Sequence, residues 1–281
     1  MESVSKDTIL KCHELMQERE RVAWYSDYNY LLEHNGHRPG AIHLYLGVSH
    51  GGKSTLMRSL IWDALRKCPS GKKVLVWLSE ETEHDFLIEF IMAGATMAKE
   101  DLLVLIGKLL IHSEMHWPEF FKRGETEKKK DYMRETFARD DIAIIFYDNI
   151  TTSEFYCDIH PSEQSTFIWE LKELISKVKK PLILVAHTAS EISENTPRFI
   201  SITDIRGSKT IANLVQFYYI LQRFSIEDAF YPTLRILKHR GQTVKDTMYY
   251  LYYSKEKNIY YKDKKIDFNA IKEAFRSRNV L

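Results

Sequence analysis

One octapeptide constrains the fold of this chain more than any other feature, because it fits the phosphate-loop pattern G-x-x-x-x-G-K-[ST] in a matching context. Its residues are Gly47, Val48, Ser49, His50, Gly51, Gly52, Lys53 and Ser54. An apolar stretch over 41–46 precedes the octapeptide, and a helical pattern begins at Thr55. That order predicts a strand, a loop and a helix, which is the setting that the motif requires.

The chemistry expected at this loop is the binding of nucleotide phosphates. Glycines let successive backbone N–H groups point at phosphate oxygens, and the start of the helix adds a partial positive charge. We predict that Lys53 reaches the β- and γ-phosphates of a nucleotide and that the Ser54 hydroxyl binds Mg²⁺. The predicted nucleotide-binding set is Gly47, Ser49, His50, Gly51, Gly52, Lys53, Ser54 and Thr55.

Short apolar runs alternate with helical patterns through most of the chain. The predicted strands are 41–46, 74–78, 109–112, 143–147 and 182–186, and the predicted helices are 55–67, 85–98, 128–139 and 164–178. Near-continuous apolar strands alternating with helices predict an α/β fold with a mostly parallel sheet that is flanked by helices. Further runs over 217–221, 234–238, 248–254 and 259–261 have short links and predict an antiparallel C-terminal strand extension, with a turn over 255–258 and a closing helix over 269–278.

Composition limits the class of protein. Lys and Arg number 40 against 39 Asp and Glu, so a nucleic-acid surface would have to be a local patch. The cysteines Cys12, Cys68 and Cys157 are far apart and suit a reducing compartment. No signal-peptide core or membrane-length apolar run is visible, which predicts a cytoplasmic protein. We expect an N-terminal arm or helix over 1–22 and one domain over 23–281.

Polar residues follow three of the predicted strands. Asp148 ends the strand over 143–147 and is expected to hold Mg²⁺, directly or through water. Glu80 and Glu81 follow the strand over 74–78, and one of them would polarise the attacking water, with the choice left open by the spacing. His187 follows the strand over 182–186 and would sense the γ-phosphate. Each could instead be an ordinary polar strand end.

These motifs in this order resemble the RecA-like ATPases, especially the branch of DnaB, RepA and KaiC, over roughly residues 28–262. The resemblance implies a RecA-like P-loop core and selects Glu81 as the catalytic carboxylate, Asp148 as the Walker B aspartate and His187 as the sensor. The stretch 234–241 is similar to the K-x-R strand of DnaB-type rings. Lys238 and Arg240 would then act on the γ-phosphate held by a neighbouring subunit, in a homo-oligomeric, hexameric ring.

A predicted loop of about twenty residues over 189–208 is the candidate nucleic-acid contact. By the resemblance it lies near a central channel, where Arg198, Arg206 and Lys209 would contact single-stranded DNA and Phe199 could stack on a base. Glu191, Glu194 and Asp204 weaken this positive patch.

The expected function is that of an ATP-hydrolysing, ring-forming, single-stranded-DNA-dependent motor resembling a replicative DNA helicase. Because the chain lacks the bracing and primase domains of DnaB-type proteins, a separate loader or primase partner fits the same interpretation. A RecA-like recombination or repair ATPase and a KaiC-like regulatory or scaffolding ATPase without DNA binding stay open as alternatives. A small-molecule phosphotransferase leaves the K-x-R strand unexplained.

Overall fold

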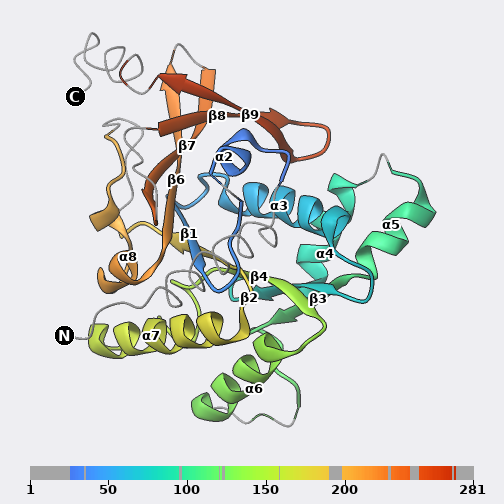
Figure 1. The fold of residues 1–281 in the computed structure, drawn as a ribbon, viewed down its shortest axis with the longest axis vertical. Coiled ribbons are helices and arrows are strands. Elements are labelled where there is room, and N and C mark those ends of the chain that lie inside the picture. Colours follow the sequence, from blue (N-terminus) through green and yellow to red (C-terminus); the bar gives the residue numbers. More distant parts are fainter. Residues whose placement is uncertain are drawn as a thin grey trace, which may run out of the picture.

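A nine-stranded sheet is the centre of the described structure, in the order β3-β2-β4-β5-β1-β6-β7-β8-β9 (Figure 1). The structure is a computed structural model that describes residues 26–34, 36–94, 97–119, 121, 124–157, 159–189, 198–226, 229–240, 247–267 and 269. The predicted arm over 1–22 and nearly all of the predicted helix over 269–278 lie outside these residues.

The first six strands pair in parallel and form the part of the sheet that carries the glycine-rich loop. They are β1 (Ile42–Gly47), β2 (Lys73–Leu78), β3 (Leu109–Ser113), β4 (Ile142–Asp148), β5 (Leu182–His187) and β6 (Phe217–Ile226). The five predicted parallel strands are confirmed to within one residue at each end. Their near-continuous apolar runs explain the agreement, because both faces of a parallel sheet are buried.

Three antiparallel strands extend the sheet beyond β6. They are β7 (Ala229–His239), β8 (Thr247–Ser254) and β9 (Ile259–Asp267), with the predicted turn between β8 and β9. Most of these strands are longer than predicted. In β9 exposed residues outnumber buried ones, so the apolar signal ends before the pairing does.

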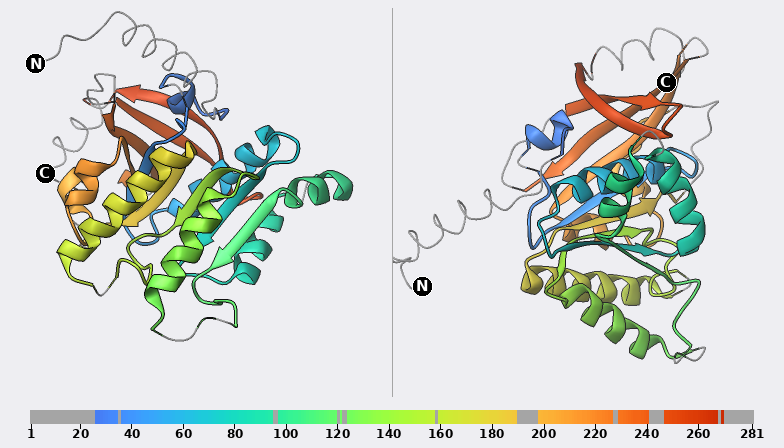
Figure 2. Two further views of the ribbon diagram at one scale, coloured as in Figure 1. Left: turned by 60° about the horizontal axis from the view of Figure 1, so that its bottom comes forward. Right: turned by 90° about the vertical axis from the view of Figure 1, so that its right-hand side faces the viewer.

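Helices cover both faces of the sheet, as two further views show (Figure 2). Their bounds are α2 (Asn29–Leu32), α3 (Lys53–Lys67), α4 (Glu83–Ala93), α5 (Lys99–Ile106), α6 (Thr126–Ala138), α7 (Pro161–Val178) and α8 (Thr210–Leu214). The prediction of one helix over 85–98 is wrong. The chain turns at Gly94, where a Cβ would lie 2.7 Å from the Trp62 ring, and a second helix, α5, begins at Lys99.

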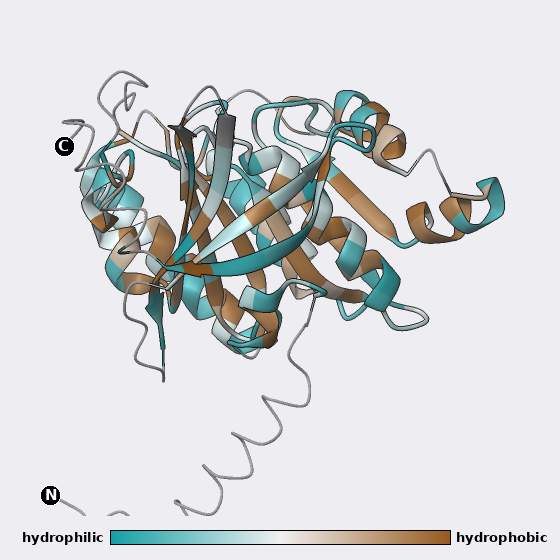
Figure 3. Ribbon diagram, turned by 90° about the horizontal axis from the view of Figure 1, so that it is seen from above, coloured by the Kyte–Doolittle hydropathy of each residue, from teal (hydrophilic) through white to brown (hydrophobic). Residues whose placement is uncertain are grey.

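The hydrophobic core is divided by the sheet into two clusters. On β2, Val76 and Leu78 belong to the cluster under α3 and α4, whereas Leu75 and Trp77 belong to the cluster under α6 and α7. This alternation is the two-residue period of a strand with both faces buried. Figure 3 shows the hydrophobic residues concentrated on the central strands, with hydrophobic and hydrophilic residues mixed along the helices. No helix of the described residues is long and apolar enough to cross a membrane.

Three buried histidines lie together where β1, β6 and β7 meet near their amino-edge ends. The His37 and His43 rings are 4.8 Å apart between centroids, and Phe217 contacts both His43 and His239. Burial lowers the pKa of His37 to about 3 and of His239 to about 4, and it lowers the pKa of His43 well below its usual value. The folded protein therefore keeps all three rings neutral where the unfolded chain would protonate them.

Acidification should accordingly destabilise the fold. The unfolded state binds more protons below about pH 6.5, so the free energy of unfolding falls by about 1.4 kcal/mol per pH unit for each neutral histidine as the pH drops from 6.5 towards 4. Urea unfolding at pH 7.5 and pH 5 measures this slope. His37→Gln should reduce it, and His84→Gln, at an exposed histidine, should not. A slope that is unchanged in His37→Gln would contradict the assignment.

Candidate functional site

The glycine-rich loop, residues 47–54, lies at the carboxyl edge of the parallel strands, between the end of β1 and the start of α3. Parallel strands present their carboxyl ends at one edge, which is where ligands of open α/β sheets bind. β5 lies between β1 and β4, and its His187 is paired in register with Gly47. The ends of β1, β5, β4 and β2 therefore bring the loop, His187, Asp148 and Glu80 to the same edge.

The loop leaves no room for larger side chains at its glycines. A Cβ on Gly47 would lie 2.8 Å from the Leu221 carbonyl oxygen, and a Cβ on Gly51 would lie 2.9 Å from the Val48 carbonyl oxygen. Gly52 is the N-cap of α3 with φ of 88°, a conformation that L side chains rarely adopt. The sequence pattern thus matches a tightly curled backbone at the amino end of a helix.

Lys53 is buried against the loop that contains it. Its Nζ donates a hydrogen bond to the Val48 carbonyl oxygen at 2.6 Å, and burial lowers its pKa to about 8 while Asp148 and Glu80 oppose that shift. This contact places the Lys53 ammonium group at the centre of the glycine-rich loop. Binding of an anionic group there would restore the charged form.

A cavity of about 490 Å³ opens over this loop. It is lined by Ser49, His50, Gly51, Gly52, Lys53, Ser54, Thr55, Arg58, Glu80, His187 and Arg223. Every predicted nucleotide-binding residue except Gly47 lines the cavity, and Gly47 forms the base of the loop behind Lys53. Its polar lining and its size fit the phosphate portion of a nucleotide.

Glu80 connects the ends of three strands. Its carboxylate is 2.8 Å from His187 Nε2 and accepts a hydrogen bond from Asn149 Nδ2 at 2.8 Å. The His187 contact is the main cause that keeps the pKa of Glu80 below its usual value. The Ser79 N–H donates to the Asp148 carbonyl oxygen at 2.9 Å, so the backbone carrying Glu80 is fixed to the end of β4.

Glu81 and Asp148 form a more buried acidic pair. Burial is the main cause that raises the pKa of Glu81 to about 7, and the charge of Asp148 adds to that effect. Burial also raises the pKa of Asp148, which is 8% exposed, with Glu80 adding to the shift and Lys53 opposing it. The two adjacent glutamates therefore differ in environment: Glu80 lines the cavity and is ionised, whereas Glu81 is poised to exchange a proton near neutral pH.

Of the three predicted nucleic-acid residues, Arg206 and Lys209 are exposed. Their side chains have no partner among the described residues. Arg198 instead pairs with Asp204 through two hydrogen bonds of 2.7 and 2.8 Å. The backbone N–H of Arg206 donates to the His187 carbonyl oxygen at 2.9 Å, so this exposed residue is tied directly to the cavity wall. Phe199 contacts Phe224 and Arg235.

Lys238 and Arg240 lie at the opposite edge of the sheet. β7 runs antiparallel to β6, which pairs Lys238 with Tyr218 near the amino end of β6. Lys238 Nζ donates to the carbonyl oxygens of Ala212 and Asn213 at 3.1 and 3.0 Å. The structure does not bring this predicted pair to the loop of the same chain.

Three residues near the loop were not predicted from the sequence. Arg58 lines the cavity and pairs with Glu89. A Cβ on Gly52 would lie 2.6 Å from Tyr260 Oη and 3.1 Å from Arg223 Nη2. Contacts between β6, β9 and a loop so distant in sequence carry no local sequence signal.

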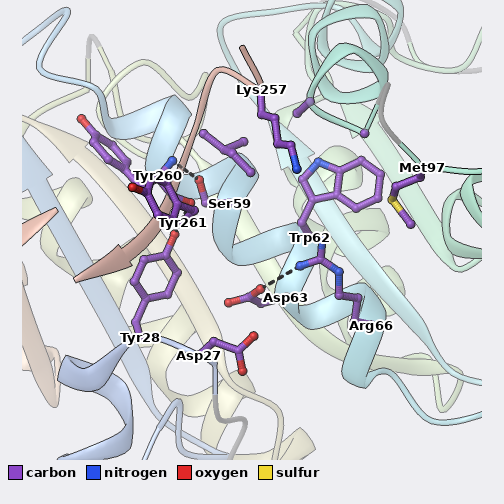
Figure 4. Close-up of a pocket in the computed structure, with 13 residues that line it drawn as sticks. Asp27, Tyr28, Ser59, Trp62, Asp63, Arg66, Met97, Lys257, Tyr260 and Tyr261 are labelled. Carbon is purple, nitrogen blue, oxygen red and sulfur yellow. Dashed lines mark hydrogen bonds and ion pairs between the residues drawn. The ribbon is translucent and has the colours of Figure 1, made fainter. Parts of the chain in front are cut away.

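Tyr260 also anchors β9 to α3. Its N–H donates to Ser59 Oγ at 3.0 Å, and its carbonyl oxygen accepts from the Tyr28 hydroxyl at 2.5 Å (Figure 4). Tyr260 borders a second cavity of about 170 Å³ along α3, into which Trp62 and Asp63 also point. No residue of the glycine-rich loop lines this second cavity.

Neither the protein-family models nor the curated proteins with which the chain was compared match it. Function is therefore inferred from the residues of the site.

Gly52→Ala should destabilise the fold more than Gly71→Ala. Both glycines have positive φ, which costs an L residue about 1–2 kcal/mol, but only Gly52 has a neighbour within 4 Å of the added Cβ. The contact with buried Tyr260 should bring the loss at Gly52 to about 2–4 kcal/mol in the free energy of unfolding. Adding Tyr260→Phe removes the clashing oxygen and should recover part of that difference. Equal losses at the two glycines would show that Tyr260 does not pack against the loop.

Proposed function

We propose that the chain is a RecA-like ATPase that binds and hydrolyses ATP with Mg²⁺ at the glycine-rich loop. The observation that carries this proposal is the convergence of Lys53, Ser54, Glu80 and His187 in one cavity, with the buried Asp148 and the partly buried Glu81 beside it. Lys53 and the loop N–H groups would hold the phosphates.

Magnesium would be held by Ser54 and Asp148 together with phosphate oxygens. No cluster of three or more His, Cys, Asp or Glu residues that could bind a metal occurs in the described part of the chain. When bound, Mg²⁺ neutralises charge on the phosphates. Of the protein groups, Glu81 is the one whose raised pKa suits acceptance of a proton from water near neutral pH.

We further propose that the active assembly is a ring of identical chains and that single-stranded DNA stimulates it, as in a replicative helicase. Arg240 lies at the edge of the sheet opposite to the loop and could act only on a nucleotide in another copy. Arg206 and Lys209 are available for a DNA backbone, and Arg206 is hydrogen-bonded to His187, which contacts Glu80. This chain of contacts would couple DNA binding to the nucleotide site.

ATP hydrolysis and its response to DNA test the proposal. Wild-type protein should hydrolyse ATP, and single-stranded DNA should raise kcat several-fold. Lys53→Ala should abolish hydrolysis and weaken nucleotide binding, and Lys255→Ala, at an exposed lysine of the β8–β9 turn, should have no effect. A rate that DNA leaves unchanged would favour a regulatory or scaffolding ATPase, and strand pairing without opening of a forked duplex would favour a recombination ATPase.

Substitution of Glu81 and substitution of Glu80 should have different effects on ATP hydrolysis. Glu81→Gln should preserve ATP binding and lower kcat by about 10²-fold or more, whereas Glu80→Gln should retain turnover and lose stimulation by DNA. Because Glu81 must be ionised to accept a proton, kcat/KM of the wild type should rise with pH through about 7. If Glu80→Gln loses turnover and Glu81→Gln keeps it, then Glu80 and not Glu81 accepts the proton.

A further inference from the structure

A positively charged cavity of about 380 Å³ opens at the amino edge of the sheet, opposite to the glycine-rich loop. Arg38 precedes β1, Lys172 projects from α7, and Arg240 follows β7, and all three line this cavity. No aspartate or glutamate is among its lining residues in the described part of the chain. We refer to Arg38, Lys172 and Arg240 as the basic pocket.

Arg38 and Lys172 of the basic pocket contact aromatic rings, and Arg38 also contacts a backbone carbonyl oxygen. The Arg38 guanidinium lies 5.4 Å from the Phe217 ring centroid, and its Nη1 donates a long hydrogen bond of 3.4 Å to the Arg240 carbonyl oxygen. Lys172 Nζ lies 4.6 Å from the centroid of the Trp169 ring. Arg38 Nε is buried and has no hydrogen-bond partner among the described residues. A buried donor without a partner beside unneutralised charges is the environment of an anion site.

Lys238 belongs to a different set of contacts. Its ammonium group donates to two carbonyl oxygens at the end of α8, which commits it to its own chain. Burial and the charges of Lys172 and Arg240 lower its pKa, so it already bears the repulsion of the nearby cations. The residues that could bind an anion together with Arg240 therefore lie outside β7.

We propose that Arg38, Lys172 and Arg240 form a phosphate-binding pocket that receives the terminal phosphate of a nucleotide held on the glycine-rich loop of a second copy of this chain. The inference rests on the proposed function and deepens it by naming Arg38 and Lys172 as further residues of the shared site, with Lys238 serving to fix α8. Guanidinium groups match phosphate oxygens in pairs, and positive charge supplied in trans stabilises a transferring phosphoryl group.

The fold itself excludes action within one chain. β1 runs from the segment of Arg38 to the loop, and its six residues span roughly 20 Å at about 3.3 Å each. Gln216 and Phe217, which line the basic pocket, are level with the start of β1, whereas Leu221 is level with Gly47. A nucleotide on the loop of one chain therefore cannot place its phosphate in the basic pocket of that same chain.

Mixing of inactive variants tests the shared site. Arg38→Gln and Lys172→Gln should each lower kcat for ATP at least tenfold with KM changed less than threefold, and Lys177→Gln, an exposed lysine on the same helix, should match wild type. Mixing either variant with Lys53→Ala should restore activity, because one chain supplies the loop and the other the basic pocket.

A second measurement does not depend on catalysis. In the Lys53→Ala background, sodium tripolyphosphate should raise the melting temperature, and adding Arg38→Gln or Lys172→Gln should remove that increase. If wild type hydrolyses ATP but Arg38→Gln and Lys172→Gln do so equally well and tripolyphosphate stabilises all variants alike, the basic pocket is wrong and the proposed function stands. If wild type does not hydrolyse ATP, the proposed function fails, and a lost tripolyphosphate shift still reveals an anion site.

Discussion

The in-register pairing of β1 with β5 on one side and β6 on the other is the constraint on which the site depends. Gly47 is opposite His187 in β5 and opposite Leu221 in β6, so the same two ladders position the glycine-rich loop and the residue that faces Glu80. A shift of one residue would exchange the two faces of β1, moving Tyr45 out of one core cluster and Ile42, Leu44 and Leu46 out of the other. Packing of the core therefore also fixes the positions of the loop and of His187 relative to each other.

The two edges of the sheet differ in the charged residues that they carry. At the carboxyl edge, the carboxylates of Glu80, Glu81 and Asp148 lie with Lys53, Arg58 and Arg223, so charges of both signs are mixed there. At the amino edge, Arg38, Lys172 and Arg240 gather without carboxylates in the pocket. In the proposed assembly of identical chains, the basic pocket of one copy would add positive charge to a phosphate held by the loop of another copy.

The parallel core and the glycine-rich loop were predictable because their signals are local: apolar runs bounded by polar residues, and a motif with fixed spacing. The break at Gly94 was not, because it depends on the Trp62 ring, and neither was the approach of Arg223 and Tyr260 to Gly52. The spacing alone left Glu80 and Glu81 equivalent, and only the resemblance selected Glu81. The folded chain gives them different surroundings, because it places Glu80 against His187 and Glu81 near Asp148.

The anchoring of β9 on α3 has a consequence for biosynthesis. Tyr260 and Ser59 are 201 residues apart, and the same tyrosine packs against Gly52. Contacts of such separation close late, because the chain entropy of a long loop must be overcome before they form. During translation the glycine-rich loop thus emerges long before the strand that completes its surroundings. The proposed nucleotide site of a nascent chain would therefore be complete only after β9 has been synthesised.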